Sequence, residues 1–276
     1  MPRVPVGDGV SLYCQDLGSG PAIMLVHGGC MSHRVWESQV HSLLEAGYRV
    51  VTPDLRGHGD SDKPASPYTA EMYADDLAVV ANRLGIDSFS LLGWSLGSTI
   101  TSAFASAYGD RLDGLVLVSS AIFARIGAVA RDERVSVDLP VERMIENQRY
   151  NRPEGLERFV TGMFHETPDK WTRHWLWTIA MQTPMRVALK TLRIYVDPEQ
   201  RTLHEGLATI DAPAAVFYGE NDRSSSVSDA RTIAEDVFSD GRYVPFEHSA
   251  HVPFIEQPQR FDNELVDFLE SVHNSA

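Results

Sequence analysis

Short apolar runs alternate with longer amphipathic segments in the first 120 residues of the chain. The apolar runs predict strands at residues 22–26, 48–51, 89–92 and 115–118. Apolar residues at helical spacing predict helices at residues 35–46, 69–84 and 98–108. An Asp-Gly pair between two alternating runs, 4–6 and 10–15, predicts a hairpin ahead of the first of these strands. Strands that alternate with helices in this way form a parallel sheet covered by helices.

The pattern changes between residues 121 and 203. Strand patterns vanish there, and prolines interrupt helix-like segments that hold three of the five tryptophans. Further along, the pattern predicts strands at residues 214–218 and 242–245 and helices at residues 226–238 and 258–272. We therefore expect an α/β core formed by residues 1–120 and 204–276. Residues 121–203 are expected to form a helical cap over the carboxyl ends of the strands, where open α/β sheets bind ligands.

Composition and charge exclude several classes of protein. The 276 residues carry a formal net charge of −14, which opposes binding to nucleic acid phosphates. Two cysteines are too few for a disulfide framework. No apolar run approaches the roughly 18 residues of a membrane span, and the first residues lack the apolar core of a secretion signal. We therefore expect a cytoplasmic protein that acts on a small molecule rather than on nucleic acid or a membrane.

The strongest chemical signal is Gly-Trp-Ser-Leu-Gly at residues 93–97, between the predicted strand 89–92 and the predicted helix 98–108. A G-x-S-x-G motif in that context is typical of a nucleophile elbow, a sharp turn that lifts the serine hydroxyl clear of the sheet. The two glycines allow the backbone to close tightly around the serine. The helix that follows offers free N–H groups to a developing oxyanion. The motif therefore makes Ser95 the candidate nucleophile.

A serine nucleophile needs a base to take its proton, and the base needs a third group to orient it. His248 and His251 lie in the loop between the last predicted strand and the last helix, and Asp222 follows the preceding strand. Parallel strands bring these loops and Ser95 to one edge of the sheet, in the order Ser95, Asp222, His251, which is the order expected for an elbow of this kind. Glu220 is the rival acid, and we rank it below Asp222.

A glycine turn, His-Gly-Gly-Cys at residues 27–30, follows the first buried strand. Its backbone N–H groups can point at a bound carbonyl oxygen. We expect the N–H groups of Gly29 and Leu96 to form the oxyanion hole. His27 is expected to brace this turn through hydrogen bonds rather than to take part in chemistry.

Together these motifs resemble the α/β-hydrolase superfamily over essentially the whole chain. The matching pieces are His27-Gly28-Gly29, Asp54-Leu-Arg-Gly-His-Gly-Asp-Ser61, Gly93-Trp-Ser-Leu-Gly97, Gly219-Glu-Asn-Asp222 and His251-Val-Pro-Phe-Ile-Glu-Gln-Pro258. The resemblance implies a mostly parallel central sheet flanked by helices, with a helical cap. It selects His251 over His248, because the family places Pro and Glu shortly after its histidine. It gives His58 no catalytic role, and it implies neither a cofactor nor a metal.

The resemblance is closest to the branch that holds cofactor-free haloperoxidases, small carboxylesterases and haloalkane dehalogenases. Dehalogenases and epoxide hydrolases carry Asp at the elbow and dienelactone hydrolases carry Cys, so Ser95 argues against all three. Cofactor-free haloperoxidases typically have His-Gly-aromatic-Pro at the oxyanion turn. This chain has Gly29-Cys30 in place of the aromatic residue and the proline, which argues against perhydrolysis. Ser98 stands where a third glycine is common in the family.

The resemblance implies hydrolysis of a carboxylic ester or lactone of a small, largely apolar substrate through an acyl-enzyme. Three alternatives stay open: carbon–carbon bond hydrolysis of a diketone-like substrate, cofactor-free haloperoxidase or perhydrolase activity, and a weakly catalytic ligand receptor. Four residues are expected to contact the substrate, namely Cys30, Trp94, Trp171 and Trp175. A test of p-nitrophenyl esters against such a diketone separates the two hydrolytic reactions.

Overall fold

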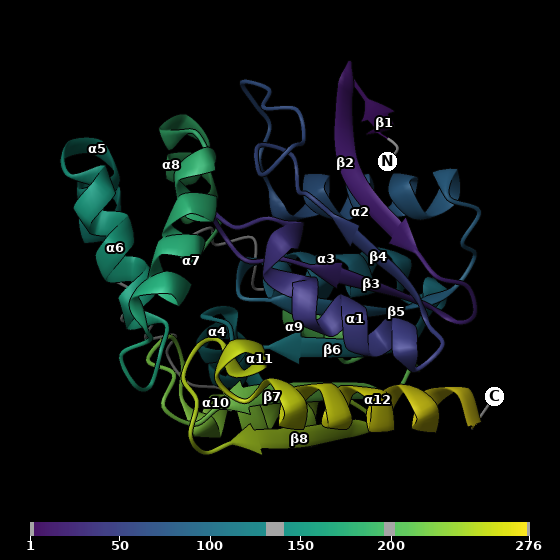
Figure 1. Ribbon diagram of the computed structural model, residues 1–276. Coiled ribbons are helices and arrows are strands. Elements are labelled where there is room, and N and C mark those ends of the chain that lie inside the picture. The colour runs from purple at the N-terminus through teal and green to yellow at the C-terminus, as the bar shows by residue number, and fades with distance from the viewer. Residues whose placement is uncertain (1–2, 131–140, 196–201, 275–276) are drawn as a thin grey trace.

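The computed structural model describes residues 3–130, 141–195 and 202–274 of the chain (Figure 1). It contains an eight-stranded sheet in the order β1-β2-β4-β3-β5-β6-β7-β8. The strands are β1 (Arg3–Gly7), β2 (Val10–Leu17), β3 (Ala22–Val26), β4 (Arg49–Pro53), β5 (Phe89–Trp94), β6 (Leu112–Val118), β7 (Ala214–Gly219) and β8 (Gly241–Phe246). The first two strands form the predicted antiparallel hairpin, and all pairs from β4 to β8 are parallel. The predicted fold class is therefore confirmed.

Helices cover both faces of this sheet. One face carries α2 (Ala70–Arg83), α3 (Leu96–Tyr108), α4 (Ile122–Ala130), α9 (Thr202–Leu207) and α10 (Val227–Thr232). The other face carries α1 (Glu37–Glu45) and α12 (Pro258–Asn274). Successive residues of β3 alternate between the two cores, with Met24 in the first and Leu25 in the second. The short apolar run at residues 22–26 is therefore continuous because both of its faces are buried.

Four further helices stand beyond the carboxyl ends of the strands (Figure 1). They are α5 (Val141–Tyr150), α6 (Arg152–Gly162), α7 (Lys170–Gln182) and α8 (Met185–Ile194). In this group α5 packs on α6 and α8, and α6 packs on α7. In contrast, α4 and α9 pack on core helices, so we propose α5–α8 as the part of the 121–203 insert that acts as a cap. Residues 131–140 and 196–201 of the insert lie outside the described residues.

Several local signals explain where helices begin and end. The Thr69 hydroxyl accepts a hydrogen bond from the Met72 N–H and caps the start of α2. The segment predicted as one helix at 226–238 begins with a capping box between Ser226 and Asp229, but it ends in a single π turn, Ile233–Val237. Short helices in the connections of the described chain are His33–Trp36, Gly109–Arg111 and α11 (Pro253–Glu256). No helix in the described ranges is both long and apolar enough to cross a membrane.

Candidate active site

Ser95 sits at the predicted elbow between β5 and α3 in a strained conformation, with φ 56° and ψ −116°. Glycine is required at positions 93 and 97 because there is no room for a Cβ atom, and not because of their φ and ψ angles. A Cβ on Gly93 would lie 2.4 Å from the Gly97 carbonyl oxygen, and a Cβ on Gly97 would lie 2.2 Å from the Val26 carbonyl oxygen. Both distances are far below van der Waals contact. The tight turn therefore depends on glycine at both positions, as the motif predicts.

Ser98 ties the elbow to the neighbouring strand. Its hydroxyl lies 2.6 Å from the Gly93 carbonyl oxygen and 2.9 Å from that of Val118, and it accepts a hydrogen bond from the Val118 N–H at 3.1 Å. The side chain is fully buried. The hydroxyl thus links the backbones of β5 and β6 at the point where β5 ends at Trp94. This bridge explains why a serine stands where the family commonly has a third glycine.

Replacing Ser98 with alanine is expected to lower the free energy of unfolding by about 1–3 kcal/mol, because the buried hydrogen bonds of its hydroxyl to the backbones of β5 and β6 are lost. Urea denaturation of the purified proteins measures the change. Ser102→Ala is a matched control on the same helix. The Ser102 hydroxyl is also buried but only donates back to the Ser98 carbonyl oxygen, so we expect its loss to cost less than about 1 kcal/mol. Equal losses in the two variants would contradict this role of Ser98.

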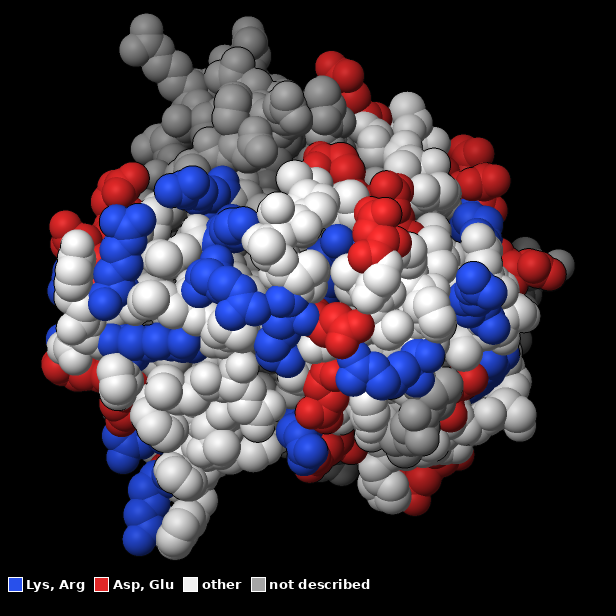
Figure 2. Space-filling view, turned by 90° about the horizontal axis from the view of Figure 1, so that it is seen from above, with Lys and Arg blue, Asp and Glu red and all other residues white. Residues whose placement is uncertain are grey.

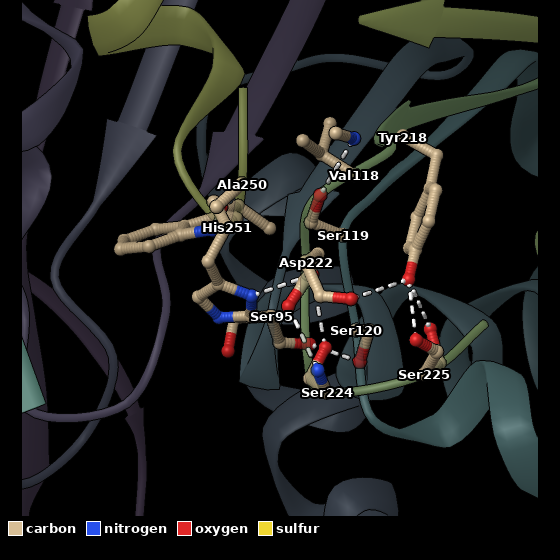
Figure 3. Close-up of polar contacts among 12 residues, drawn as sticks. Ser95, Val118, Ser119, Ser120, Tyr218, Asp222, Ser224, Ser225, Ala250 and His251 are labelled. Atoms are coloured by element: carbon tan, nitrogen blue, oxygen red, sulfur yellow. Dashed lines mark hydrogen bonds and ion pairs between the residues drawn. The ribbon is translucent and has the colours of Figure 1, made fainter. Parts of the chain in front are cut away.

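His251 and Asp222 form the predicted pair. Nδ1 of His251 lies 2.9 Å from Oδ2 of Asp222, and Figure 3 shows the imidazole directed at the carboxylate. The Ser224 N–H and hydroxyl each donate to the same carboxylate at 2.9 Å. Burial opposes ionisation of Asp222, but the nearby His251 and these hydrogen bonds outweigh it and hold the Asp222 pKa below its usual value. Asp222 is therefore an ionised acceptor that fixes the orientation of the imidazole.

The loop that carries His251 is held from three sides. The His251 N–H donates to the Met163 carbonyl oxygen at 2.8 Å, which links the loop to the cap. The Trp94 indole N–H donates to the His251 carbonyl oxygen at 2.7 Å. Glu256, the glutamate of the motif that follows His251, accepts the backbone N–H groups of Ala250 and His165, each at 2.7 Å. These bonds position the imidazole before any substrate arrives.

The Ser95 hydroxyl faces the cap. Across the described chain it lies within hydrogen-bond distance of one side chain, Tyr195, whose hydroxyl is 3.5 Å away. Burial raises the pKa of Tyr195 to about 12, so this hydroxyl stays protonated at neutral pH. Tyr195 directly follows α8. The cap thus places a hydrogen-bonding group beside the candidate nucleophile.

One cavity of about 400 Å³ joins these groups. Its wall includes the candidate catalytic and oxyanion residues, Gly29, Ser95, Leu96, Asp222 and His251. Much of the remaining wall is apolar and includes Cys30, Leu156, Phe159, Met163, Ala188 and Leu192. Within the described residues, no acceptor takes the backbone N–H of Gly29 or of Leu96. Both N–H groups are therefore free to receive an oxyanion formed at Ser95.

The predicted substrate contacts need correction. Cys30 lines the cavity, but Trp94, Trp171 and Trp175 do not. Trp94 is 1% exposed and packs edge-on against Phe254, so it supports the His251 loop instead. Trp171 is 69% exposed, in the first turn of α7 and on a different side of that helix from the buried Leu176. Trp175 packs, partly buried, against the second core.

The two rival catalytic candidates lie outside the cavity wall. His248 is exposed and lies outside the cavity wall, and Glu220 is also absent from that wall. Sequence reasoning missed Tyr195 and three arginines, Arg143, Arg158 and Arg223, which also line the cavity. Only Arg223 had an available signal, because it follows the candidate acid directly.

His27 and His58 are fully buried beside the glycine turn, with ring centroids 5.2 Å apart. Nδ1 of His27 lies 2.8 Å from the Gly28 carbonyl oxygen, and Nε2 accepts the Leu55 N–H at 3.1 Å. Burial lowers the pKa of His27 to about 4 and that of His58 to about 3. Both rings are therefore neutral in the folded protein and serve the bracing role expected for His27.

Because the pKa values of both histidines are lowered in the folded protein, we expect the protein to lose stability in mild acid. Their folded pKa values lie below the unfolded value of about 6.5, so the unfolded chain takes up two protons that the folded chain excludes as the pH falls. The free energy of unfolding should fall by about 3–4 kcal/mol between pH 7 and pH 5. Urea denaturation at several pH values measures this slope. His58→Asn, which keeps a donor for the Arg56 carbonyl oxygen, should halve it, and an unchanged slope would contradict the assignment.

Comparison with known proteins agrees with this geometry. Residues 21–258 match the model of the α/β hydrolase fold. An AB hydrolase superfamily protein, YisY, of Bacillus subtilis is 27% identical over 95% of this chain and 96% of its own. A non-heme haloperoxidase from Rhodococcus erythropolis is 23% identical over 98% of this chain and 100% of its own. The solved structure of an esterase from Exiguobacterium antarcticum superposes with a TM-score of 0.85 at 26% identity, over 95% of this chain and 97% of that one.

The family match covers most of the sheet, the elbow and the loop that carries His251. The esterase and haloperoxidase matches extend over nearly the full length of both chains. Because the model of the α/β hydrolase fold matches most of the sequence, this chain belongs to the α/β-hydrolase family.

Proposed function

We propose that the protein hydrolyses a carboxylic ester or lactone through an acyl-enzyme on Ser95. The observation that carries the proposal is the single cavity whose wall holds Ser95, the His251–Asp222 pair and the free N–H groups of Gly29 and Leu96. These are the groups that acyl transfer requires: a nucleophile, an oriented base and an oxyanion hole. The similarity to an esterase at 26% identity supports the same reaction class.

In the first half of the reaction, the Ser95 hydroxyl turns from Tyr195 towards His251, since such bonds tighten when substrate binds. Oγ then attacks the substrate carbonyl carbon while Nε2 of His251 takes the hydroxyl proton. Asp222 accepts from the Nδ1–H and stabilises the imidazolium. The Gly29 and Leu96 N–H groups hold the oxyanion, and each is expected to lower the barrier by about 3–4 kcal/mol.

Collapse of this intermediate breaks the carbon–oxygen bond of the ester, and the imidazolium gives its proton to the leaving alcohol. In a lactone the alcohol stays attached to the acyl group. His251 then takes a proton from water, whose oxygen attacks the acyl carbon. A second collapse returns the proton to Ser95 and releases a carboxylic acid. Every proton taken by His251 is given back, and ester and water become acid and alcohol without a change of oxidation state, so the cycle needs no redox step.

The apolar part of the cavity selects a substrate with an apolar body. Side chains such as Leu156, Phe159 and Met163 come from the cap and face the catalytic groups. Apolar area buried from water contributes roughly 25 cal/mol per Å². We therefore expect kcat/KM to rise with acyl chain length until the chain fills the cavity of about 400 Å³.

Hydrolysis of p-nitrophenyl esters with acyl chains of two to about twelve carbons tests the proposal. We expect turnover with an optimum at intermediate length, and loss of binding beyond it. Three other results would point elsewhere. Turnover of a diketone-like compound without turnover of any ester would indicate carbon–carbon hydrolysis. Bromination dependent on peroxide and acetate, faster than ester hydrolysis, would indicate perhydrolysis, and ligand-induced stabilisation without turnover would indicate a receptor.

A further inference from the structure

The mouth of the catalytic cavity differs in charge from the rest of the molecule. The chain has 24 Lys and Arg against 38 Asp and Glu, yet three arginines line the cavity and the only acidic residue in its described wall is Asp222. That carboxylate already accepts from His251 and Ser224. The cavity is therefore locally cationic in a strongly acidic protein, which favours an anionic ligand.

The three arginines come from three separate elements: Arg143 from α5, Arg158 from α6, and Arg223 from the loop after β7. Each side chain is exposed at the surface while also lining the cavity, so the three lie at its mouth. Seen from above, Lys and Arg gather over the side of the molecule where the cap helices stand in Figure 1 (Figure 2). Cap and core thus contribute cationic groups to one opening.

The three arginines differ in whether another side chain of the protein already pairs with their guanidinium group. Arg158 pairs with Glu154 at 2.8 Å, and the two side chains are 51% and 58% exposed. Neither Arg143 nor Arg223 has a hydrogen bond or ion pair within the described part of the chain. A guanidinium presents a planar set of donors that matches a carboxylate in two parallel hydrogen bonds. Two such groups at the opening, neither paired with a described residue, are available to a ligand.

The geometry points to a substrate that carries a carboxylate, which Arg143 and Arg223 bind at the cavity mouth while the ester or lactone carbonyl lies at Ser95. This inference rests on the proposed function and names its substrate class: an apolar chain with an ester at one end and a carboxylate at the other. The apolar wall of the cavity holds the chain between the two ends. A neutral ester of equal length leaves both guanidiniums without a partner.

Matched substrates test the inference. A p-nitrophenyl hemi-ester of octanedioic acid and p-nitrophenyl octanoate have acyl chains of the same length and differ in a terminal carboxylate or methyl group. The four- and six-carbon pairs extend the series. We expect wild-type kcat/KM to favour the carboxylate at one or more lengths, and the preference to shrink as sodium chloride is raised. A preference for the neutral ester at every length would overturn the inference.

Arginine variants locate the effect. Arg143→Gln and Arg223→Gln should each reduce the ratio of the two kcat/KM values by about three- to tenfold, since charged hydrogen bonds at partly exposed sites are of that strength. The ratio compares the two esters in the same variant, so an effect common to both esters cancels. Arg149→Gln removes the same charge from α5 at an exposed position outside the cavity wall, and should leave the ratio within twofold. An equal fall in all three variants would mean a general charge effect and no carboxylate site.

Binding separates this inference from the proposed function. Calorimetric titration of Ser95→Ala with the same pair of esters measures affinity without turnover. Tighter binding of the carboxylate, lost in Ser95→Ala/Arg143→Gln/Arg223→Gln, would support the anion site even if wild-type protein hydrolysed no ester. Hydrolysis of both esters with equal affinity and equal kcat/KM would leave the proposed function standing and refute the carboxylate site.

Discussion

Replacing Ser95 with alanine is expected to lower kcat for p-nitrophenyl esters by at least about 10³-fold, because the variant lacks the hydroxyl at the elbow that forms the acyl intermediate. The residual rate would come from water activated by His251 and from the oxyanion hole. Steady-state release of p-nitrophenolate from wild-type and variant proteins measures the change.

Ser95→Ala should keep its fold. Alanine and serine pay a similar conformational cost for the φ of 56° at this position. Among the described side chains, the lost hydroxyl contacts Tyr195, at 3.5 Å. The free energy of unfolding should therefore change by less than about 0.5 kcal/mol, as for substitutions away from strong interactions. A folded variant that retains more than a tenth of wild-type kcat would rule out Ser95 as the nucleophile.

Asp222→Asn is expected to lower kcat by about 10²–10⁴-fold. An amide can present an N–H to Nδ1 of His251 where the carboxylate accepts one, which favours the tautomer that cannot take the serine proton. The charge that stabilises the imidazolium is also lost. Steady-state kinetics with the optimal ester measures the effect, and the fall should appear in kcat rather than in KM.

Glu220→Gln is the control for this substitution, because Glu220 is the rival acid on the same loop. Its backbone N–H donates to the Phe246 carbonyl oxygen, and its side chain is absent from the cavity wall. We expect less than a twofold change in kcat. A loss in Glu220→Gln as large as that in Asp222→Asn would reverse the assignment of the acid.

The placement of Ser95, Asp222 and His251 could be predicted because strand order alone determines it. Each residue follows a strand of the parallel part of the sheet, where the neighbours β5, β6, β7 and β8 end at one edge. The requirement for glycine at 93 and 97 was also predictable, since a tight turn after a strand leaves no room for a Cβ. These features depend on local sequence and on the period of the apolar pattern.

The cap residues that line the cavity could not be predicted in the same way. Trp171 and Trp175 are four residues apart and share one side of α7, and Trp177 lies on another side, so the spacing alone does not tell which side meets the cavity. How α7 packs on α6 decides which residues of α7 reach the cavity, and none of the three tryptophans is part of its wall. Tyr195 contacts Ser95 although the two are 100 residues apart in the sequence, and the hydrophobic pattern cannot predict such a contact.

Covalent labelling tests the acyl-enzyme most directly. An alkyl p-nitrophenyl phosphonate mimics the tetrahedral intermediate and stays bound to the serine that attacks it. We predict one adduct per chain by intact mass, located on the peptide that contains Ser95, with activity lost in proportion and no adduct in Ser95→Ala. Inactivation with the adduct on another residue, or equal labelling of Ser95→Ala, would contradict the account.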